Sequence, residues 1–199
     1  MNDTLPTRFE MAKRHHLHTL EKAIAEGKID NRMIPFSKMM AGNKDYFTTS
    51  TCSGRITLMD LDTEERKREG AFYRKWHSTV KPHEVWEAIE AYEGEKNLWL
   101  KQDGFVMVIG THSLEKAKKI FKVCQEAGIK RFGIHHIEEG KILMEVYGTT
   151  QMSMPIVIDG KKDVDKNYVS KVVALANIKW KRNEQRRKHF EKTLRKYLS

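Results

Sequence analysis

The stretch that decides the fold and suggests the chemistry of this chain is Tyr46-Phe47-Thr48-Thr49-Ser50-Thr51-Cys52-Ser53-Gly54-Arg55-Ile56. Its first four residues are aromatic or β-branched, which predicts a strand over residues 46–49. Small residues predict a loop over 50–54, and the alternation that starts at Arg55 predicts a second strand over 55–59. We therefore expect two strands joined by a loop of hydroxyl and thiol side chains.

The predicted loop has the side chains to bind a polar ligand. Hydroxyls offer hydrogen-bond donors and acceptors, and Gly54 lets the backbone approach a ligand closely. Arg55 adds a forked cation that suits a carboxylate or a phosphate. The alternative is an ordinary turn whose hydroxyls bond to their own backbone. Taken alone, these residues leave both interpretations open.

Helices and strands are expected on both sides of this stretch. Helices are predicted over residues 7–26, 31–41, 83–92, 114–127 and 166–197. Further strands are predicted over 72–76, 105–109, 130–137, 141–147 and 154–158, and an exposed loop over 62–70. Because the elements mix without a regular βαβ rhythm, we expect an α+β fold with a mixed β-sheet and not a Rossmann fold. The length suits one domain over residues 1–199, or two lobes packed together.

Composition narrows the class of protein. Of 199 residues 39% are hydrophobic, which indicates a globular chain. The net charge of +10 suits a polyanion such as nucleic acid, although an ordinary basic protein can carry it too. Cys52 and Cys124 lack zinc-ligand or disulfide spacing, so we expect no metal and a reducing compartment. No apolar run nears the roughly 20 residues of a membrane span, and residues 1–8 lack a signal-peptide core, which favours the cytoplasm.

The common nucleotide-binding signatures are missing from the chain. No G-x-G-x-x-G pattern occurs, and Gly160-Lys161 lacks the rest of a phosphate loop. Any nucleotide chemistry must therefore rest on another motif.

The segment from Ser50 to Arg55 resembles the Ser/Thr-rich Cys-Ser-Gly-Arg motif of the wybutosine-synthesis N4-methyltransferases. Further landmarks follow in the order of that family, and the resemblance covers most of residues 8–195. They are Trp76-His77, Leu100-Lys101, Phe105-Val106, Gly128 to Ile134, Pro155-Ile156 and the basic helix after Tyr168.

The resemblance implies a function and a candidate site. Members of the family transfer a methyl group from S-adenosyl-L-methionine to N4 of the tricyclic base beside the anticodon of phenylalanine tRNA, on an α+β fold unlike the Rossmann methyltransferases. Carried over to this chain, the motif assigns donor binding to Ser50, Thr51, Cys52, Gly54 and Arg55. The same resemblance assigns catalysis to Ser53 and His77.

The chemistry of methyl transfer suggests a role for His77. The acceptor nitrogen gives up a proton, and a histidine has an ordinary pKa suited to accepting it. The alternative is a histidine that is merely hydrogen-bonded near the core. Cys52 is interpreted as a packed residue and not a nucleophile, because in-line methyl transfer needs no covalent enzyme intermediate.

Several positions depart from the family pattern. The family tends to have Pro and then His in the strand where this chain has Gly104 and Val108, Ser at Phe132, and Arg-Ser at Tyr147-Gly148. These losses of polar groups leave an alternative, a divergent paralogue that binds tRNA without this methylation. A generic basic structural protein does not explain the ordered landmarks.

A cluster of cations marks the C-terminal helix. Residues 179–188 contain six cations and one acid: Lys179, Lys181, Arg182, Arg186, Arg187 and Lys188, with Glu184. Such a stripe can follow a phosphate backbone, which makes RNA contact the favoured interpretation. The alternative is a solvated helix face. The sequence does not indicate an oligomeric state.

Overall fold

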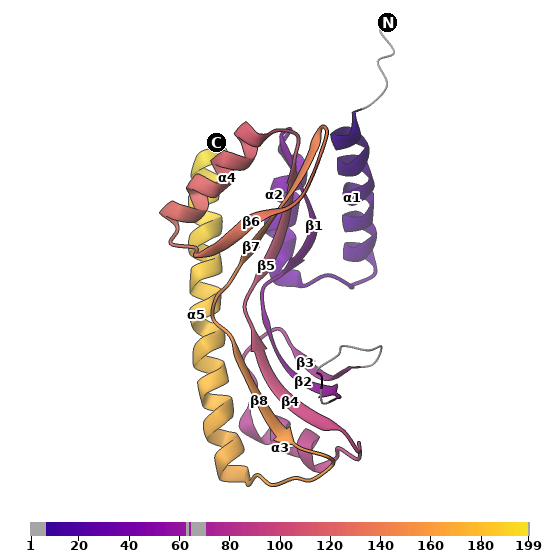
Figure 1. The fold of residues 1–199 in the computed structure, drawn as a ribbon, viewed down its shortest axis with the longest axis vertical. Helices are drawn as coiled ribbons and strands as arrows, with labels where there is room; N and C mark the ends of the chain where they lie inside the picture. The colour runs from indigo at the N-terminus through magenta and orange to yellow at the C-terminus, as the bar shows by residue number, and fades with distance from the viewer. Residues whose placement is uncertain (1–6, 63, 65–70, 199) are drawn as a thin grey trace, which may run out of the picture. The chain divides into compact units, whose positions relative to one another are not determined.

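A computed structural model describes residues 7–62, 64 and 71–198 (Figure 1). The chain divides into two compact units. Unit 1 comprises Met1–Ser53, Phe105–Gly148 and Arg186–Ser199, and unit 2 comprises Gly54–Gly104 and Thr149–Gln185. Within the described ranges, no helix is long and apolar enough to cross a bilayer.

Unit 1 contains a four-stranded antiparallel sheet in the order β1-β5-β7-β6. Its strands are β1 (Tyr46–Cys52), β5 (Val106–Thr111), β7 (Lys141–Tyr147) and β6 (Arg131–Glu138). Its helices are α1 (Arg8–Ala25), the 3₁₀ helix η1 (Asn31–Met33), α2 (Ile34–Gly42), α4 (Leu114–Glu126) and the end of α5 (Lys166–Leu198). Figure 1 shows the strands lying between α4 and α1.

The helices of unit 1 start where the sequence supplies caps. Thr7 and Glu10 form a reciprocal capping box at α1, and the Asp30 side chain accepts the Arg32 amide at η1. Pro35 lies in the first turn of α2, where its missing N–H costs nothing. Ser113 caps α4 by accepting the Lys116 amide. Local side-chain chemistry therefore decides where these helices begin.

The two faces of the unit 1 sheet bury different helices. Because side chains alternate along a strand, Tyr46 and Phe47 point to opposite faces. Tyr46 belongs to the main core, which α2, α4 and the end of α5 complete through residues such as Phe36, Ile120 and Phe190. Phe47 lies on the other face, where its ring contacts Phe9 of α1 at 5.5 Å between centroids. The sheet is thus buried on both sides near β1.

Unit 2 contains a second four-stranded antiparallel sheet in the order β3-β2-β4-β8. Its strands are β3 (Phe72–Trp76), β2 (Arg55–Leu61), β4 (Asn97–Asp103) and β8 (Met152–Val157), and its helices are α3 (Pro82–Glu90) and the first part of α5. One face of the sheet packs against α3 and α5 through a core that includes Leu58, Leu100, Ile89 and Val173.

The structure confirms the expected α+β class and nearly all expected elements. The strands form two sheets, and each pairing in the described ranges is antiparallel where we had expected one mixed sheet. The strand β4 was missed, because Lys101, Gln102 and Asp103 interrupt its apolar pattern. The predicted loop over 50–54 was too long: β1 pairs with β5 as far as Cys52, after an irregularity between Thr48 and Ser50. Most of the loop predicted over 62–70 lies outside the described residues.

Candidate functional site

The end of β1 places the first part of the motif in unit 1. Ser50 is exposed, Thr51 and Cys52 are half-buried, and Ser53 is fully buried. The Ser53 backbone N–H donates to Oδ2 of Asp30 over 2.8 Å, while Oδ1 of Asp30 accepts the Arg32 amide. One carboxylate therefore ties the end of β1 to the start of η1, and it lies within 4.8 Å of the Cys52 thiol.

A polar pocket of about 210 Å³ opens beside the motif in unit 1. Its walls come from α1, the segment before η1, α2 and β1. The lining residues are His16, Thr19, Leu20, Ala23, Lys28, Ile29, Asp30, Ser37, Thr48, Thr49, Ser50 and Thr51. The pocket thus gathers hydroxyls, one carboxylate, one amine and one imidazole, which are groups that can bind a polar, charged molecule.

Three of the pocket's side chains are held in place by contacts with other side chains. The hydroxyls of Ser37 and Thr51 lie 3.3 Å apart and share a hydrogen bond. The His16 ring stacks on Phe47 at 5.3 Å between centroids and an angle of 10°. Burial lowers the pKa of His16 below its ordinary value, and the charges of His15 and Lys141 add to this effect. The imidazole is therefore neutral at pH 7, able both to donate and to accept.

Gly54 begins the part of the motif that lies in unit 2, and the fold requires a glycine there. Its φ is +94°, a conformation that side chains rarely adopt. A Cβ at this position would lie 2.6 Å from Nδ2 of Asn183 and 2.7 Å from the backbone oxygen of Asp103. The backbone therefore passes closely against its neighbours within unit 2, and this close packing explains the glycine without a ligand.

Arg55 is held on β2 by two contacts. Its Nε lies 3.5 Å from Oδ2 of Asp103, and its guanidinium lies over the Phe72 ring at 4.5 Å from the centroid. Ile56 of β2 pairs with Trp76 of β3, and the two strands are antiparallel. The residue after Trp76, His77, therefore follows on the side of the residue before Ile56, which is Arg55. His77 is half-buried. Unit 2 thus brings Gly54, Arg55 and His77 into one neighbourhood.

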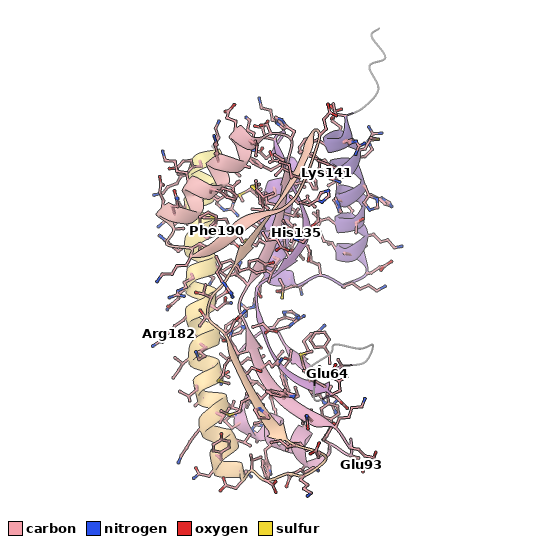
Figure 2. All side chains as sticks on the ribbon, viewed as in Figure 1. Glu64, Glu93, His135, Lys141, Arg182 and Phe190 are labelled. Carbon is pink, nitrogen blue, oxygen red and sulfur yellow. The ribbon has the colours of Figure 1, made fainter. Side chains whose placement is uncertain are left out.

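The cations predicted for RNA contact lie on different sides of α5. Lys181, Arg182, Arg186 and Lys188 are exposed, and Lys179 is half-buried. Arg187 is only 3% exposed, pairs with Glu191 and donates toward the Arg32 carbonyl at 3.5 Å. Figure 2 labels Arg182 and Phe190 on this helix, one exposed and the other fully buried. Arg187 lies on the side of Phe190, so the stripe prediction was incorrect for this residue.

Sequence reasoning missed residues that structure brings to the motif. Asp30 was expected only as a helix cap, and its bond to Ser53 joins positions 23 residues apart. Asp103 was not singled out, although it pairs with Arg55. A capping signal identified Asp30, but no local pattern indicates a contact between distant segments.

The positions that depart from the family pattern contribute to packing. Phe132 contacts Phe121 at 5.1 Å between ring centroids and joins the unit 1 core. Val108 is buried, and the Gly148 N–H donates to the Phe105 carbonyl over 2.8 Å. Gly104 lies 3.2 Å from the position of a Cβ on Gly54. None of these residues is among those that line the polar pocket.

Comparison with known proteins assigns the class. The chain belongs to the family described as methyltransferase TYW3, which matches residues 11–196. A Pyrococcus horikoshii protein named tRNA(Phe) 7-((3-amino-3-carboxypropyl)-4-demethylwyosine(37)-N(4))-methyltransferase 1 is 32% identical over 183 residues, which are 92% of this chain and 93% of the relative. A Thermococcus sibiricus protein of the same named activity is 29% identical and covers 94% of this chain and 95% of its own.

A solved structure supports the same assignment. The structure of the PH1069 protein from Pyrococcus horikoshii matches with a TM-score of 0.87 at 30% identity, over 95% of each chain. The family resemblance inferred from the Ser50–Arg55 motif and its collinear landmarks is thereby confirmed. The protein is a methyltransferase of this family.

Proposed function

We propose that this protein transfers the methyl group of S-adenosyl-L-methionine to N4 of the tricyclic wyosine precursor in tRNA(Phe). The observation that carries the proposal is the end-to-end match to relatives named for this reaction, at 29% and 32% identity over 94% and 92% of the chain. In this proposal the chain acts in the cytoplasm, its two units together form one methyltransferase domain, and tRNA is its partner.

The polar pocket of unit 1 suits part of the methyl donor. The Asp30 carboxylate complements the donor's ammonium group. The hydroxyls of Thr49, Ser50 and Thr51 complement a ribose. At about 210 Å³ the pocket is smaller than the roughly 300 Å³ that encloses a drug-sized ligand, so it takes only part of the donor.

The remaining motif residues are assigned by their chemistry. The family motif assigns donor binding to Cys52, which lies beside Asp30, and to Gly54. Arg55 binds the donor carboxylate or an RNA phosphate through its forked guanidinium. His77 accepts the proton that the acceptor nitrogen loses, and Ser53 supports catalysis from the buried end of β1.

The exposed cations of α5 supply the proposed electrostatic contact with tRNA. Lys179, Lys181, Arg182, Arg186 and Lys188 are kept in this assignment, and the buried Arg187 is left out. Replacing Lys181 and Arg182 by Gln should make the slope of log tRNA affinity against log salt less steep, by the contribution of about two phosphate contacts. An unchanged slope would remove α5 from the RNA surface.

The reaction is tested directly with labelled S-adenosyl-L-methionine and tRNA(Phe) carrying the unmethylated tricyclic precursor. Label on that base is the expected result. A folded protein that binds the tRNA tightly but transfers no label would refute the proposal and identify a divergent binding protein. Loss of transfer in His77→Ala, with transfer retained in the exposed control His83→Ala, supports the proton acceptor; full turnover in His77→Ala excludes it.

The donor site is tested by equilibrium binding of S-adenosyl-L-methionine. Asp30→Asn removes the negative charge of the side chain. Because a hydrogen bond to a charged group contributes about 1.5–3 kcal/mol, the affinity for the donor should fall by about tenfold or more. Asp45→Asn is the matched control: it is half-buried in the same unit, pairs with Lys116, and does not line this pocket. Equal affinities in the two variants would place the donor elsewhere. Arg55→Lys keeps the charge without the fork, and undiminished binding of both donor and tRNA would end the Arg55 assignment.

A further inference from the structure

A second hollow of unit 1, of about 590 Å³, lies beside the first turns of α1. Its walls come from α1, the segment between α2 and β1, the segment that leads into α4 and the turn between β6 and β7. The lining residues are Thr7, Phe9, Glu10, Lys13, Lys44, Asp45, His112 and Gly140. We call it the α1 hollow. It shares no lining residue with the polar pocket, and its volume lies within the range of roughly 300–1,000 Å³ that is usual for ligand pockets.

The two carboxylates of the α1 hollow are already held by protein groups. Oδ1 of Asp45 lies 3.1 Å from Nε2 of His112, and Oδ2 of Asp45 accepts from Nζ of Lys116 over 2.6 Å. Hydrogen bonds from Lys116 and His112 lower the pKa of Asp45, so this carboxylate stays ionised and paired. Glu10 accepts the backbone N–H of Thr7 over 2.7 Å in the capping box of α1. The groups that remain for a ligand are therefore mainly donors.

Two lysines among the lining residues supply positive charge. Lys44 is exposed, and its amine has no hydrogen-bond or ion-pair partner among the described residues. Lys13 is half-buried, and its amine donates to the carbonyls of Asn43 and Tyr46. Because an ammonium carries three N–H donors, one donor of Lys13 remains for a ligand. Burial lowers the pKa of Lys13, and an anion in contact with the amine would replace part of the hydration that the amine has lost.

His112 completes the donor set. Its ring lies edge-on to the Phe9 ring, at 5.2 Å between centroids and an angle of 73°, and its side chain is 39% exposed. Because Nε2 faces Asp45, Nδ1 is the ring nitrogen that is left for a ligand, and both nitrogens donate when the ring is protonated. Three side chains with nitrogen donors thus border one hollow in which both carboxylates already have partners.

We propose that the α1 hollow binds a phosphate group, held by the amines of Lys13 and Lys44 and by Nδ1 of His112. An ionised phosphate accepts hydrogen bonds at several oxygens, and lysine binds it as a point charge. The phosphate can belong to a free small molecule or to the backbone of tRNA, and the experiments below separate these two sources. Only the second source rests on the proposed function.

Free phosphate is tested with inorganic pyrophosphate, whose binding is measured by isothermal titration calorimetry at constant ionic strength. Lys44→Gln should weaken this binding by about threefold or more, which is the size expected for an ion pair at an exposed site. Lys118→Gln is the matched control, because Lys118 is an exposed lysine of the same unit that does not line the hollow. The control removes the same charge from the chain and so corrects for general electrostatic attraction.

Lys13→Met tests the half-buried amine. It should weaken pyrophosphate binding by about tenfold or more, a larger loss than at Lys44, because a hydrogen bond to a charged group contributes more when it is shielded from water. Since Lys13 also holds the Asn43 and Tyr46 carbonyls, the fold of the variant is checked by thermal unfolding followed by circular dichroism. If Lys13→Met does not fold, the comparison of Lys44→Gln with its control decides.

Backbone phosphate is tested by salt-dependent binding of tRNA(Phe), measured by fluorescence anisotropy. Lys44→Gln should make the slope of log affinity against log salt less steep by about 0.7–0.9, the contribution of one phosphate contact, whereas Lys118→Gln should keep the wild-type slope. Pyrophosphate should then compete with the tRNA. A site for a free small molecule instead predicts pyrophosphate binding that depends on Lys44, with the tRNA slope unchanged.

The site proposal is overturned if Lys44→Gln matches Lys118→Gln in both measurements. The enzymatic proposal is decided separately, by transfer of label to tRNA. A wild type that methylates its tRNA while the two variants match would leave the enzyme standing and remove this site. A wild type that transfers no label but binds pyrophosphate through Lys44 would keep the phosphate site and end the enzymatic proposal.

Discussion

Gly54→Ala should destabilise unit 2 by about 2–5 kcal/mol. The first contribution comes from φ, which is +94° at Gly54 and costs a residue with a Cβ about 1–2 kcal/mol. The second comes from crowding, because the new Cβ would lie 2.6 Å from Asn183 Nδ2 and 2.7 Å from the Asp103 backbone oxygen. The Asn183 side chain and the backbone at Asp103 must move, and forcing atoms into packed space costs about 1–3 kcal/mol.

Urea unfolding followed by tryptophan fluorescence measures this loss in the unit concerned. All four tryptophans, Trp76, Trp86, Trp99 and Trp180, belong to unit 2. With a urea m-value of about 2 kcal/mol/M, the fluorescence midpoint should fall by about 1–2.5 M. Far-UV circular dichroism, which reports both units, provides the comparison signal.

Gly160→Ala is the matched control for the conformational cost. Gly160 lies in the same unit with a φ of +72°, and its nearest heavy atoms would be 3.5 Å from a Cβ, an ordinary contact. Its substitution should cost only about 1–2 kcal/mol, a midpoint shift of about 0.5–1 M. Equal shifts in the two variants would refute the argument that close packing at Gly54 demands glycine.

Three further predictions concern unit 1. Gly110→Ala should lower its stability by about 1–3 kcal/mol in thermal unfolding followed by circular dichroism, because a Cβ there would lie 2.2 Å from the Phe47 ring. Burial lowers the pKa of His16, so the unfolded chain binds more protons below pH 6.5; stability is full above that pH and falls as the pH drops toward the folded pKa. His16→Gln should remove this part of the pH dependence in urea titrations, and an unchanged profile would assign it to another group. Arg187→Met should cost about 3 kcal/mol by breaking the ion pair of the buried Arg187 with Glu191, while tRNA binding by the folded protein should keep its salt slope.

The residues that depart from the family pattern lie in packed positions and not in the Ser50–Arg55 segment. Phe132 and Val108 pack in unit 1, and Gly104 lies against the backbone near Gly54. These positions differ from the family pattern while the Ser50–Arg55 segment is kept, which favours the enzyme over a divergent binding protein as the hypothesis to test first.

The local features of this protein were predictable from its sequence. Capping chemistry at Thr7, Asp30 and Ser113 sets helix starts within a few residues, and the apolar repeat of α5 places Val169, Val173 and Trp180 inside. The motif from Ser50 to Arg55 indicated the family because side-chain chemistry within a short segment is visible in the order of residues alone.

Features that depend on distant contacts were decided only by the tertiary structure. The extension of β1 to Cys52 requires hydrogen bonds to β5, and β4 exists as a strand because β2 and β8 pair with both of its edges despite its polar residues. The bond from Ser53 to Asp30 joins segments that share no sequence pattern, and Arg187 is buried although it lies in a run of cations. The physical reason is the same in each case: strand pairing and burial depend on which segments meet in space, and a single sequence specifies those partners only through the complete fold.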